Sequence, residues 1–586
     1  MKKFYLMMSM LLAFGTAANA VPAKKLQKVV MLADGTTVTV ELRGDEYLGW
    51  WQGADGKAYR ETAADENVYE AFDLDAVKPA AAARRARVEE GRAQRMARVK
   101  KSAEVDNGKM RAIGGEHIVY TGTKKGLVVL VDFKNKAFED SHDLDYYKRI
   151  INEKNFSMED NGKTYFGSVR DYFLAQSNGK FDLDFDVVGP VTMSENYGYY
   201  GQDSNSQKDV NVDQMIKEAC DAISDQVNFA DYDWDGDGEA DQVFFLYAGL
   251  GQASGGAAST IWPHESKLQY WSSGKLKYAT GTVNTYACAN ELQPVSQGSK
   301  YYIPAGIGTI CHEFSHCLGF ADMYDTNGQL NYGMSIWDLM DQGSYMDDGF
   351  CPCNYTAFER IYAGWVEPIE LMDPANVDAM KSSSDYGRPF IIYNYKNTNE
   401  YFLLENRQNT GWDSQLYGCN GLLITHIDYD ISAWSNNTVN ATGEKRQRCT
   451  VVCADGTQDF QNVASLRGDA YPYESKGVVI NDEFTDDSDP AAKLYYKNSD
   501  GSWYAGVPLT QIKRNADKTI SFLVMGGDAN NVLDNTNEIV DGISTITTDI
   551  KTADHRVFSI DGRYLGTDAS RLGKGIYVVG GKKIVK

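Results

Sequence analysis

The sequence GTICHEFSHCLGFADMYD, residues 308–325, contains two of only seven histidines in a chain of 586 residues. His312 and His316 are four residues apart, so on a helix they lie one turn apart on the same face. From there both imidazoles can reach one metal ion at ~2.0–2.1 Å. Apolar residues recur around them at spacings of three and four, and Pro304 and Gly319 bound the segment. The pattern therefore predicts a helix with a buried face that carries a metal site.

The full pattern reads HExxHxxGxxD, which is more specific than HExxH alone. Gly319 can take a positive φ, so the chain can leave the helix and return Asp322 towards the metal as a third ligand. Three protein ligands and one open position are typical of a catalytic zinc site. Glu313 is offset beside the attacking water and is the predicted general base. Asp325 follows closely, and the sequence leaves open which of the two aspartates binds zinc.

Met340 lies downstream, in the tight, glycine-containing stretch SIWDLMDQGSY, residues 335–345. A single methionine is most often an ordinary core residue. Because the zinc pattern precedes it, we interpret Met340 as the methionine of a Met-turn beneath the metal.

A second cation motif, DWDGDGEAD, spans residues 233–241. It resembles the start of an EF-hand loop, although the twelfth position is Phe244 instead of glutamate. An acidic turn without metal is the alternative, but carboxylates this close repel one another without a cation. The predicted calcium ligands are Asp233, Asp235, Asp237 and Asp241.

The first twenty residues run from Lys2 and Lys3 through an apolar stretch to the small residues Ala18–Ala20. This is the pattern of a bacterial secretory signal, and the apolar stretch is shorter than the ~20 residues of a membrane anchor. No later stretch is long and apolar enough to span a membrane. We therefore expect a secreted or cell-surface protein without a transmembrane segment.

The acidic charge lies almost entirely in the body of the chain. The net charge is −23, of which residues 1–20 contribute +2 and residues 21–109 contribute +1, so residues 110–586 carry −26. Such a surface repels nucleic acid, so we expect no nucleic-acid partner. The nine cysteines form no obvious disulfide framework, and their odd number leaves at least one thiol without an intramolecular partner.

Residues 29–59 alternate apolar and polar residues between Asp-Gly turns and predict a small antiparallel sheet. A basic linker follows, with cleavable pairs at Arg84-Arg85 and Lys100-Lys101, which suggests a propeptide. The run GLVVLVDFKN, residues 126–135, predicts a buried central strand. Further on, SVRDYFLAQSNG predicts a helix and DQVFFLYAG another strand. Short strands and frequent turns over 366–524 favour an all-β sandwich.

These readings divide the chain into five parts. They are a signal peptide (1–20), a propeptide (21–109), a catalytic domain (110–365), a β-sandwich (366–526), and a linker with a small carboxy-terminal domain (527–586). The predicted fold class is α+β, with an all-β domain downstream and small β units at both ends.

Several stretches together resemble the immune inhibitor A family of secreted bacterial metallopeptidases. They are the zinc segment, VVLVDFKN, SVRDYFLAQSNGKFDLDFDVVGPV, DWDGDGEADQVFFLYAG, IWPHE, EYFLLENRQNTGWD and GLLITHID. The resemblance implies a propeptide, a metzincin-like catalytic domain and a β-sandwich packed behind it. It also implies zinc bound by His312, His316 and Asp322, with Glu313 as the base. The last residues, VFSIDGR to KKIVK, resemble the sorting domain recognised by the type IX secretion machinery.

The sequence thus predicts a secreted zinc endopeptidase, made as a zymogen, that hydrolyses proteins or peptides. The metal would activate water, and Glu313 would take its proton and pass it to the leaving amine. One alternative is a non-catalytic adhesin or glycan-binding protein on a protease scaffold, but an intact Glu313 argues against it. A zinc hydrolase of a non-peptide substrate is a further alternative. Cleavage specificity, activation site and oligomeric state do not follow from the sequence.

Overall fold

The computed structural model describes the chain in segments: residues 18–19, 21–62, 65–83, 85, 120–204, 208–296, 299–328, 331–442, 446–460 and 462–537, and the strands of the carboxy-terminal unit. These residues form two compact units, Met1–Asn537 and Glu538–Lys586. Most of the signal peptide and of the basic linker lies outside the described residues. So does the predicted boundary between propeptide and catalytic domain.

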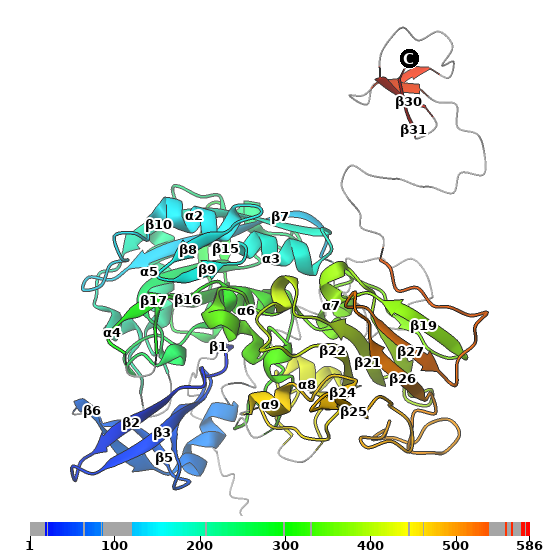
Figure 1. Cartoon of the computed structure of the whole chain (residues 1–586). Helices are drawn as coiled ribbons and strands as arrows, with labels where there is room; N and C mark the ends of the chain where they lie inside the picture. The colour runs from blue at the N-terminus through cyan, green and yellow to red at the C-terminus, as the bar shows by residue number, and fades with distance from the viewer. Residues whose placement is uncertain are drawn as a thin grey trace, which may run out of the picture. The chain divides into compact units, whose positions relative to one another are not determined.

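The amino-terminal residues form a closed barrel, drawn in blue in Figure 1. Its strands are β2 (Gln27–Leu32), β3 (Thr37–Gly44), β4 (Gly49–Gly53), β5 (Ala58–Thr62) and β6 (Asp65–Phe72). Neighbouring strands pair antiparallel, but β2 and β6 pair parallel and close the barrel. The small antiparallel sheet predicted over 29–59 is thus present as β2 to β5, and β6, which lies beyond the predicted stretch, returns beside β2 and closes it into a barrel.

A seven-stranded sheet forms the centre of the next part, in the order β1-β13-β16-β12-β7-β10, with β17 paired to β16. The bounds are β1 (Ala18–Asn19), β7 (Gly122–Asp132), β10 (Phe181–Thr192), β12 (Val243–Leu250), β13 (His264–Lys267), β16 (Thr285–Pro294) and β17 (Tyr302–Pro304). Four long strands, β7, β10, β12 and β16, run parallel. β13 is antiparallel to β16, and β1 adds to the edge of β13.

The apolar run at residues 127–131 lies in β7, and each of its side chains is fully buried, as predicted for a central strand. Hydrophobic cores cover both faces of the sheet. The longer helices packed there are α2 (Leu144–Asn152), α3 (Val169–Gln176), α5 (Val212–Ile223) and α6 (Gly308–Cys317). The sheet is therefore buried on both sides, as a largely parallel sheet requires.

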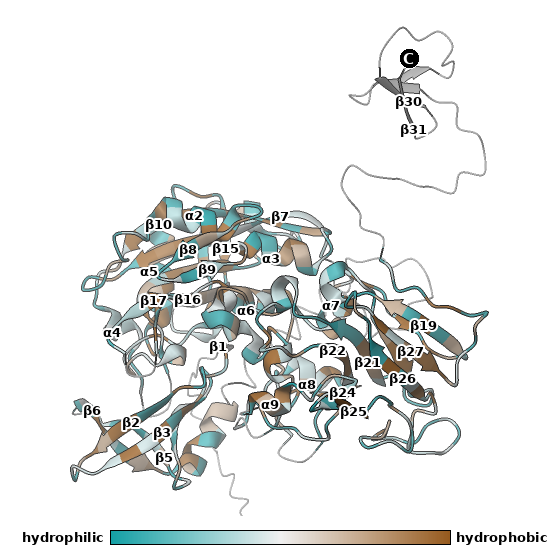
Figure 2. Cartoon of the chain, in the orientation of Figure 1, coloured by the Kyte–Doolittle hydropathy of each residue, from teal (hydrophilic) through white to brown (hydrophobic). Residues whose placement is uncertain are grey.

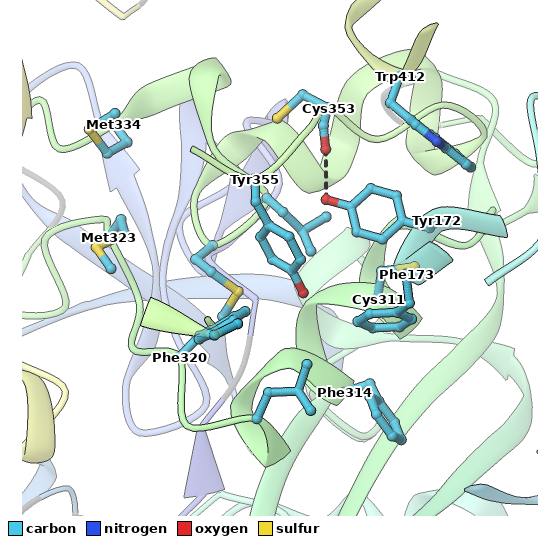
Figure 3. Packing of buried hydrophobic residues seen from close by; sticks show 14 of the residues in the cluster. Tyr172, Phe173, Cys311, Phe314, Phe320, Met323, Met334, Cys353, Tyr355 and Trp412 are labelled. Carbon is cyan, nitrogen blue, oxygen red and sulfur yellow. Dashed lines mark hydrogen bonds between the residues drawn. The ribbon is translucent and has the colours of Figure 1, made fainter. Parts of the chain in front are cut away.

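α6 is the predicted histidine helix, and all ten of its residues are buried. It packs against α3, which begins at a capping box formed by Ser168 and Asp171. Figure 3 shows Phe173 of α3 beside Phe314 of α6, with ring centroids 5.5 Å apart. Tyr172 donates a hydrogen bond to the carbonyl of Cys353 at 2.8 Å. These contacts fix the histidine helix inside a dry core.

Two further sheets follow the seven-stranded sheet along the chain. One has the order β18-β20-β21-β22-β23 and the other β19-β27-β26. Their bounds are β18 (Ile369–Glu370), β19 (Ala375–Met380), β20 (Phe390–Tyr393), β21 (Glu400–Arg407), β22 (Gly421–Asp428), β23 (Cys449–Val451), β26 (Leu509–Arg514) and β27 (Ile520–Val524). Figure 2 shows hydrophobic residues along β26 and β27.

Side chains of β21 alternate between two cores because successive residues of a strand face opposite sides. Phe402 and Leu404 belong to the core shared with β27, whereas Tyr401 and Leu403 belong to the core that contains α6. The five-stranded sheet is therefore packed between the three-stranded sheet and the core that contains α6. Residues up to Asn537 belong to this first unit, and Asn535 donates a hydrogen bond to the carbonyl of Lys381.

The second unit contains one four-stranded sheet in the order β29-β28-β30-β31. Its strands are β28 (Val557–Ser559), β29 (Tyr564–Gly566), β30 (Ile576–Val579) and β31 (Lys582–Val585). Across both units, the chain is a mixed α/β protein with many sheets and few helices. Among the described residues, no helix has the length and apolar composition needed to cross a bilayer. All nine cysteines are buried, and none of them forms a disulfide bond.

Candidate metal centre and substrate cleft

Three side chains meet at one point beside α6. The Nε2 atom of His312 lies 3.1 Å from the Oδ1 atom of Asp322, and the Nε2 atom of His316 lies 3.5 Å from the same oxygen. One ligand atom from each of these residues lies within 4.8 Å of the other two. His312 and Asp322 are fully buried, so water does not solvate these polar atoms.

The hydrogen bonds of the two imidazoles determine which nitrogens face the cluster. His312 Nδ1 lies 2.8 Å from the carbonyl oxygen of Leu339, and His316 Nδ1 lies 2.8 Å from that of Phe320. A carbonyl can only accept, so each Nδ1 carries the hydrogen and each Nε2 presents a lone pair. His312 Nε2 and Asp322 Oδ1 are thus two acceptors that face each other without a hydrogen-bond partner. This donor set fits a zinc ion.

Asp322 reaches the cluster because the chain turns sharply after the helix, at Gly319, whose φ is +88°. The carboxylate of Asp325 instead accepts hydrogen bonds from the backbone N–H groups of Asn327 and Asn331. It is not among the three gathered side chains.

Asp322 is also held by Asn437, which lies in the turn after α8 (Ile431–Ser435), between β22 and β23. The side-chain oxygen of Asn437 accepts a hydrogen bond from the Asp322 backbone N–H at 2.6 Å, and its amide nitrogen donates to Asp322 Oδ2. Asn437 is buried and has a φ of +49°. Both contacts leave Oδ1 directed at the histidines, so Asn437 orients the aspartate in the way that a metal ligand is usually oriented.

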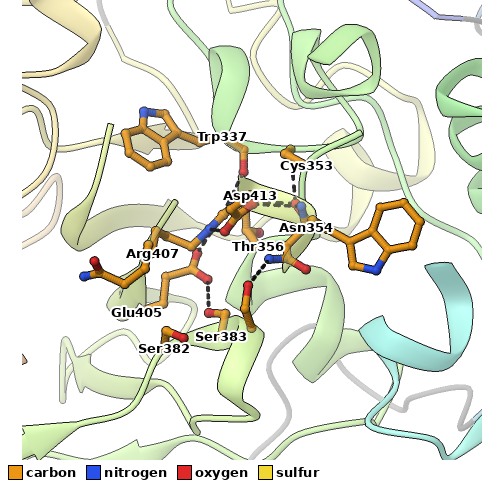
Figure 4. A network of polar contacts seen from close by, with 12 residues as sticks. Trp337, Cys353, Asn354, Thr356, Ser382, Ser383, Glu405, Arg407 and Asp413 are labelled. Atoms are coloured by element: carbon orange, nitrogen blue, oxygen red, sulfur yellow. Dashed lines mark hydrogen bonds and ion pairs between the residues drawn. The ribbon is translucent and has the colours of Figure 1, made fainter. Parts of the chain in front are cut away.

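Met340 is fully buried and follows Leu339, whose carbonyl holds His312. Figure 4 shows the network that supports this turn. Arg407, at the end of β21, donates to the carbonyl of Trp337 at 2.8 Å and binds both carboxylate oxygens of Asp413. The bond from Arg407 to Trp337 connects β21 to the turn that carries the acceptor of His312, and the buried bidentate pair with Asp413 fixes the guanidinium in place.

Glu313 faces a segment from the amino-terminal part of the same chain. The backbone N–H of Val21 donates to Glu313 Oε1 at 2.6 Å. Trp262 donates from its indole to the Val21 carbonyl at 3.1 Å, and Tyr345 donates to the Pro22 carbonyl at 2.8 Å. Just before it, β1 pairs with the sheet edge β13. Residues 18–19 thus add to the sheet edge as a bound peptide does, and Val21 and Pro22 lie beside Glu313 and Tyr345.

The hairpin between β3 and β4 covers the same region. Asp45 and Glu46 at its tip are buried, and Asp45 forms a buried ion pair with Arg85. Burial and the charges of Asp45 and Asp322 raise the pKa of Glu46. A buried hairpin and an extended segment therefore cover the candidate metal centre together.

The acidic loop brings together three of the four predicted calcium ligands. Carboxylate oxygens of Asp233, Asp235 and Asp237 lie within 4.8 Å of one another. Asp241 is not in this group, and its Oδ2 accepts a hydrogen bond from the Trp234 backbone N–H. The loop lies between η1 (Phe229–Tyr232) and β11 (Glu239–Ala240).

With this geometry in place, the comparison with known families is specific. Residues 120–365 match the profile described as the immune inhibitor A peptidase M6 catalytic domain. This part of the chain is therefore similar to the immune inhibitor A family. Its M6 domain contains α6, the whole seven-stranded sheet except β1, and the Met340 turn. The family assignment supports a peptidase, and a metallopeptidase implies a bound metal.

Two known relatives are similar over part of the chain. The pre-pro-metalloprotease PrtV of Vibrio cholerae serotype O1, from strains M66-2 and ATCC 39315 / El Tor Inaba N16961, is 25% identical over 260 residues, which cover 38% of this chain and 27% of the relative. Immune inhibitor A of Bacillus thuringiensis subsp. alesti is 25% identical over 325 residues, covering 45% and 44%. The chain therefore spans less than half the length of either relative.

Sequence reasoning missed most of the residues that surround the M6 site. Asn437 lies 115 residues from Asp322, and Trp262 lies 241 residues from Val21. The stretch IWPHE contains Trp262, and only its resemblance to the family marks it in the sequence. His264 in that stretch is buried, with its ring nitrogens near the carbonyl of Trp262 and the hydroxyl of Tyr286. It is a structural residue of the sheet edge.

Proposed function

We propose that this protein is a secreted zinc endopeptidase that is synthesised as a zymogen. The observation that carries the proposal is the placement of a peptide nitrogen, that of Val21, at 2.6 Å from Glu313 beside the three gathered ligands. A general base must lie within hydrogen-bonding reach of the atoms between which it moves a proton. Glu313 meets that requirement for a peptide amide.

His312, His316 and Asp322 would hold the zinc, which supplies a Lewis acid for a peptide carbonyl. Glu313 is not one of these ligands. Its carboxylate accepts a proton from the attacking water and delivers it to the amide nitrogen of the leaving peptide, where Val21 lies in this chain. Trp262 and Tyr345 donate to main-chain carbonyls and so orient the peptide without reading its side chains.

Residues 21–109 contain no cysteine, so the propeptide would inhibit through a carboxylate or by steric cover and not through a thiolate on zinc. The contact of Val21 with Glu313 favours steric cover. If the leader is removed after Ala20, the Val21 nitrogen becomes a terminal amine at the same place. The signal-peptide pattern and the tail that resembles a type IX sorting domain support export by that machinery. Calcium would bind Asp233, Asp235 and Asp237, with Asp241 as the fourth predicted ligand.

A non-catalytic adhesin on the same scaffold is the second candidate, and the intact Glu313 argues against it. The distinguishing experiment incubates the processed protein with a complex peptide library, with and without a chelator, and reads the cut sites by mass spectrometry. Chelator-sensitive cleavage is expected. If the zinc-loaded processed protein cuts no peptide, the endopeptidase proposal is wrong.

The variants separate the roles of the site residues. Glu313→Ala should retain zinc and the fold but lose about 10²–10⁴-fold in rate, because the base is not a ligand. Replacing His312, His316 or Asp322 should release zinc, whereas Asp325→Asn should retain it. Zinc content and peptidase rate are measured together on each variant. Normal zinc binding by Asp322→Asn, combined with loss in Asp325→Asn, would show that the wrong aspartate is proposed.

A further inference from the structure

The side chain of Lys24 lies between Gln293 and Asp348, which together form what we call the lysine pocket. Its Nζ atom donates to Gln293 Oε1 at 2.7 Å and to Asp348 Oδ1 at 2.8 Å. The Lys24 side chain is 14% exposed. The lysine belongs to the amino-terminal segment, whereas both acceptors belong to the M6 domain. The pocket therefore holds the Lys24 amine, which would be removed from it when the amino-terminal segment is released.

Gln293, in β16, is prepared to accept such an amine. It is 1% exposed, and its amide nitrogen donates to the carbonyl of Pro304 at 3.1 Å and to that of Asp348. Because both contacts use the N–H groups, the oxygen is directed towards Lys24. The same bond to the Asp348 carbonyl joins the two acceptors into one rigid pocket.

The charge balance of the pocket also favours a cation. Lys163 Nζ contacts Asp347 at 2.8 Å and Asp348 at 2.9 Å, so one ammonium group serves two carboxylates. Without Lys24, this group carries one net negative charge. Burial opposes the ionisation of Asp348, but Lys24 and Lys163 offset it and keep the pKa of Asp348 below its ordinary value. A basic side chain would restore the balance after the segment has left.

The place of Lys24 along a substrate follows from Val21. The Val21 nitrogen contacts Glu313, which makes Val21 equivalent to the first residue after the scissile bond. Lys24 is then equivalent to the fourth. We propose that Gln293 and Asp348 form a subsite that recognises a lysine or arginine side chain at the fourth substrate residue after the scissile bond. This inference rests on the proposed endopeptidase function.

The test uses the processed, zinc-loaded protein and a set of peptides that share one cleavable sequence. The residue four positions after the cut is varied among lysine, arginine, alanine and glutamate. Because the pair is partly exposed and charge-assisted, we expect kcat/KM to be about fivefold higher for the basic residues than for alanine, and lower still for glutamate. Equal rates for all four peptides would overturn the inference while leaving the endopeptidase proposal intact.

Asp348→Asn should abolish the preference for basic residues. Asp347→Asn is the matched control, because both aspartates have positive φ, at +58° and +48°, and both contact Lys163, but only Asp348 contacts Lys24. Asparagine tolerates that backbone conformation. Melting temperatures verify that both variants fold. Loss of the preference in Asp347→Asn but not in Asp348→Asn would contradict the assignment.

A binding measurement does not depend on hydrolysis. Calorimetry compares the synthetic peptide Val-Pro-Ala-Lys-Lys, residues 21–25, with the same peptide carrying alanine in place of Lys24. We expect about fivefold weaker binding of the alanine peptide to the parent protein and no difference for Asp348→Asn. If the alanine peptide binds the parent equally well, the pocket does not recognise lysine. If no library peptide is cut but this difference is found, the endopeptidase proposal fails while the pocket is retained.

Discussion

Asn437 shows how a single residue outside the M6 domain controls the candidate metal centre. Its amide satisfies both the backbone N–H and the Oδ2 atom of Asp322. The remaining oxygen of the aspartate therefore points to His312 and His316 without competition. A residue in this role affects zinc through the ligand's orientation, because it does not itself touch the metal position.

We predict that Asn437→Gly weakens zinc binding about 10–100-fold, since an unsupported ligand loses its orientation. Glycine is chosen because it accepts the positive φ of residue 437 without strain. Zinc affinity is measured by competition with a chelator. Asn436→Ala is the neighbouring control and should bind zinc normally. Unchanged affinity in Asn437→Gly would contradict this role.

The burial of His264 makes the stability of the fold depend on pH. Burial lowers the pKa of His264 to about 4, although the Trp262 carbonyl and Glu265 raise it in part. An unfolded histidine titrates near 6.5. The unfolded chain therefore binds a proton that the folded chain excludes between these values. This stability is fully present above pH ~6.5 and is lost as the pH falls towards 4.

We predict a difference in acid sensitivity between the parent protein and His264→Gln. The histidine should contribute a loss of ~3 kcal/mol in the free energy of unfolding as the pH falls from 6.5 to below 4. Glutamine keeps a donor and an acceptor but does not titrate. Chemical denaturation at pH 7 and pH 5 measures the free energy of unfolding of both proteins. Subtracting the change in the variant from the change in the parent removes the contribution of the other titrating groups. Identical pH slopes would show that His264 is not responsible.

At the scale of an element, the acidic loop between η1 and β11 is shaped by its own backbone. Asp233 accepts hydrogen bonds from the N–H groups of Gly236 and Gly238, at 2.7 Å and 2.8 Å. These bonds curl the loop and bring Asp235 and Asp237 close to Asp233. Their mutual repulsion is the physical reason to expect a cation there.

We predict that calcium raises the melting temperature of metal-stripped protein to which zinc has been restored. Binding should stabilise the fold by ~2.7 kcal/mol at one hundred times the dissociation constant. Asp235→Asn should reduce the effect. Asp231→Asn is the control, since Asp231 is exposed and bonds to the side chain of Asn228. A melting temperature that does not change across the titration would show that the loop is only a turn.

At the scale of the whole molecule, the barrel, the M6 domain and the downstream sheets share one compact unit. The chain just before the barrel supplies the segment beside Glu313, β21 supplies Arg407, and the turn after α8 supplies Asn437. Because the amino-terminal segment and the M6 domain belong to one uncleaved chain, rebinding of the segment beside Glu313 is intramolecular. With an effective concentration of ~1 mM, a segment that binds with ~1 µM affinity leaves ~0.1% of the sites open.

We therefore predict that the uncleaved chain is latent and that cleavage of the basic linker after the barrel activates it. Peptidase rates before and after limited trypsin treatment measure this, with Glu313→Ala as the inactive control. The activity should rise further when the released barrel is removed by chromatography. After cleavage the segment is a separate molecule and no longer rebinds at the high effective concentration of the uncleaved chain. Full activity in the uncleaved chain would contradict latency.

Local patterns in the sequence predict the elements of the catalytic core. The apolar run at residues 126–135 becomes the central strand β7, the helical spacing around His312 becomes α6, and Gly319 takes the positive φ that returns Asp322. The strand, the helix and the turn each depend on residues that are only a few positions apart in the sequence. Periodicity and turn chemistry act over that range, so the sequence alone carries the information.

The closure of the barrel and the partners of the site residues depend on contacts between distant parts of the chain. Closure of the barrel requires β6 to meet β2, Asn437 approaches Asp322 from 115 residues away, and Lys24 contacts Asp348 across 324 residues. No local pattern marks such partners, because an asparagine or a lysine has the same sequence signature whether it lies on a surface or in a cleft. Only burial in the tertiary structure, where an unpaired polar group is costly, selects these pairs.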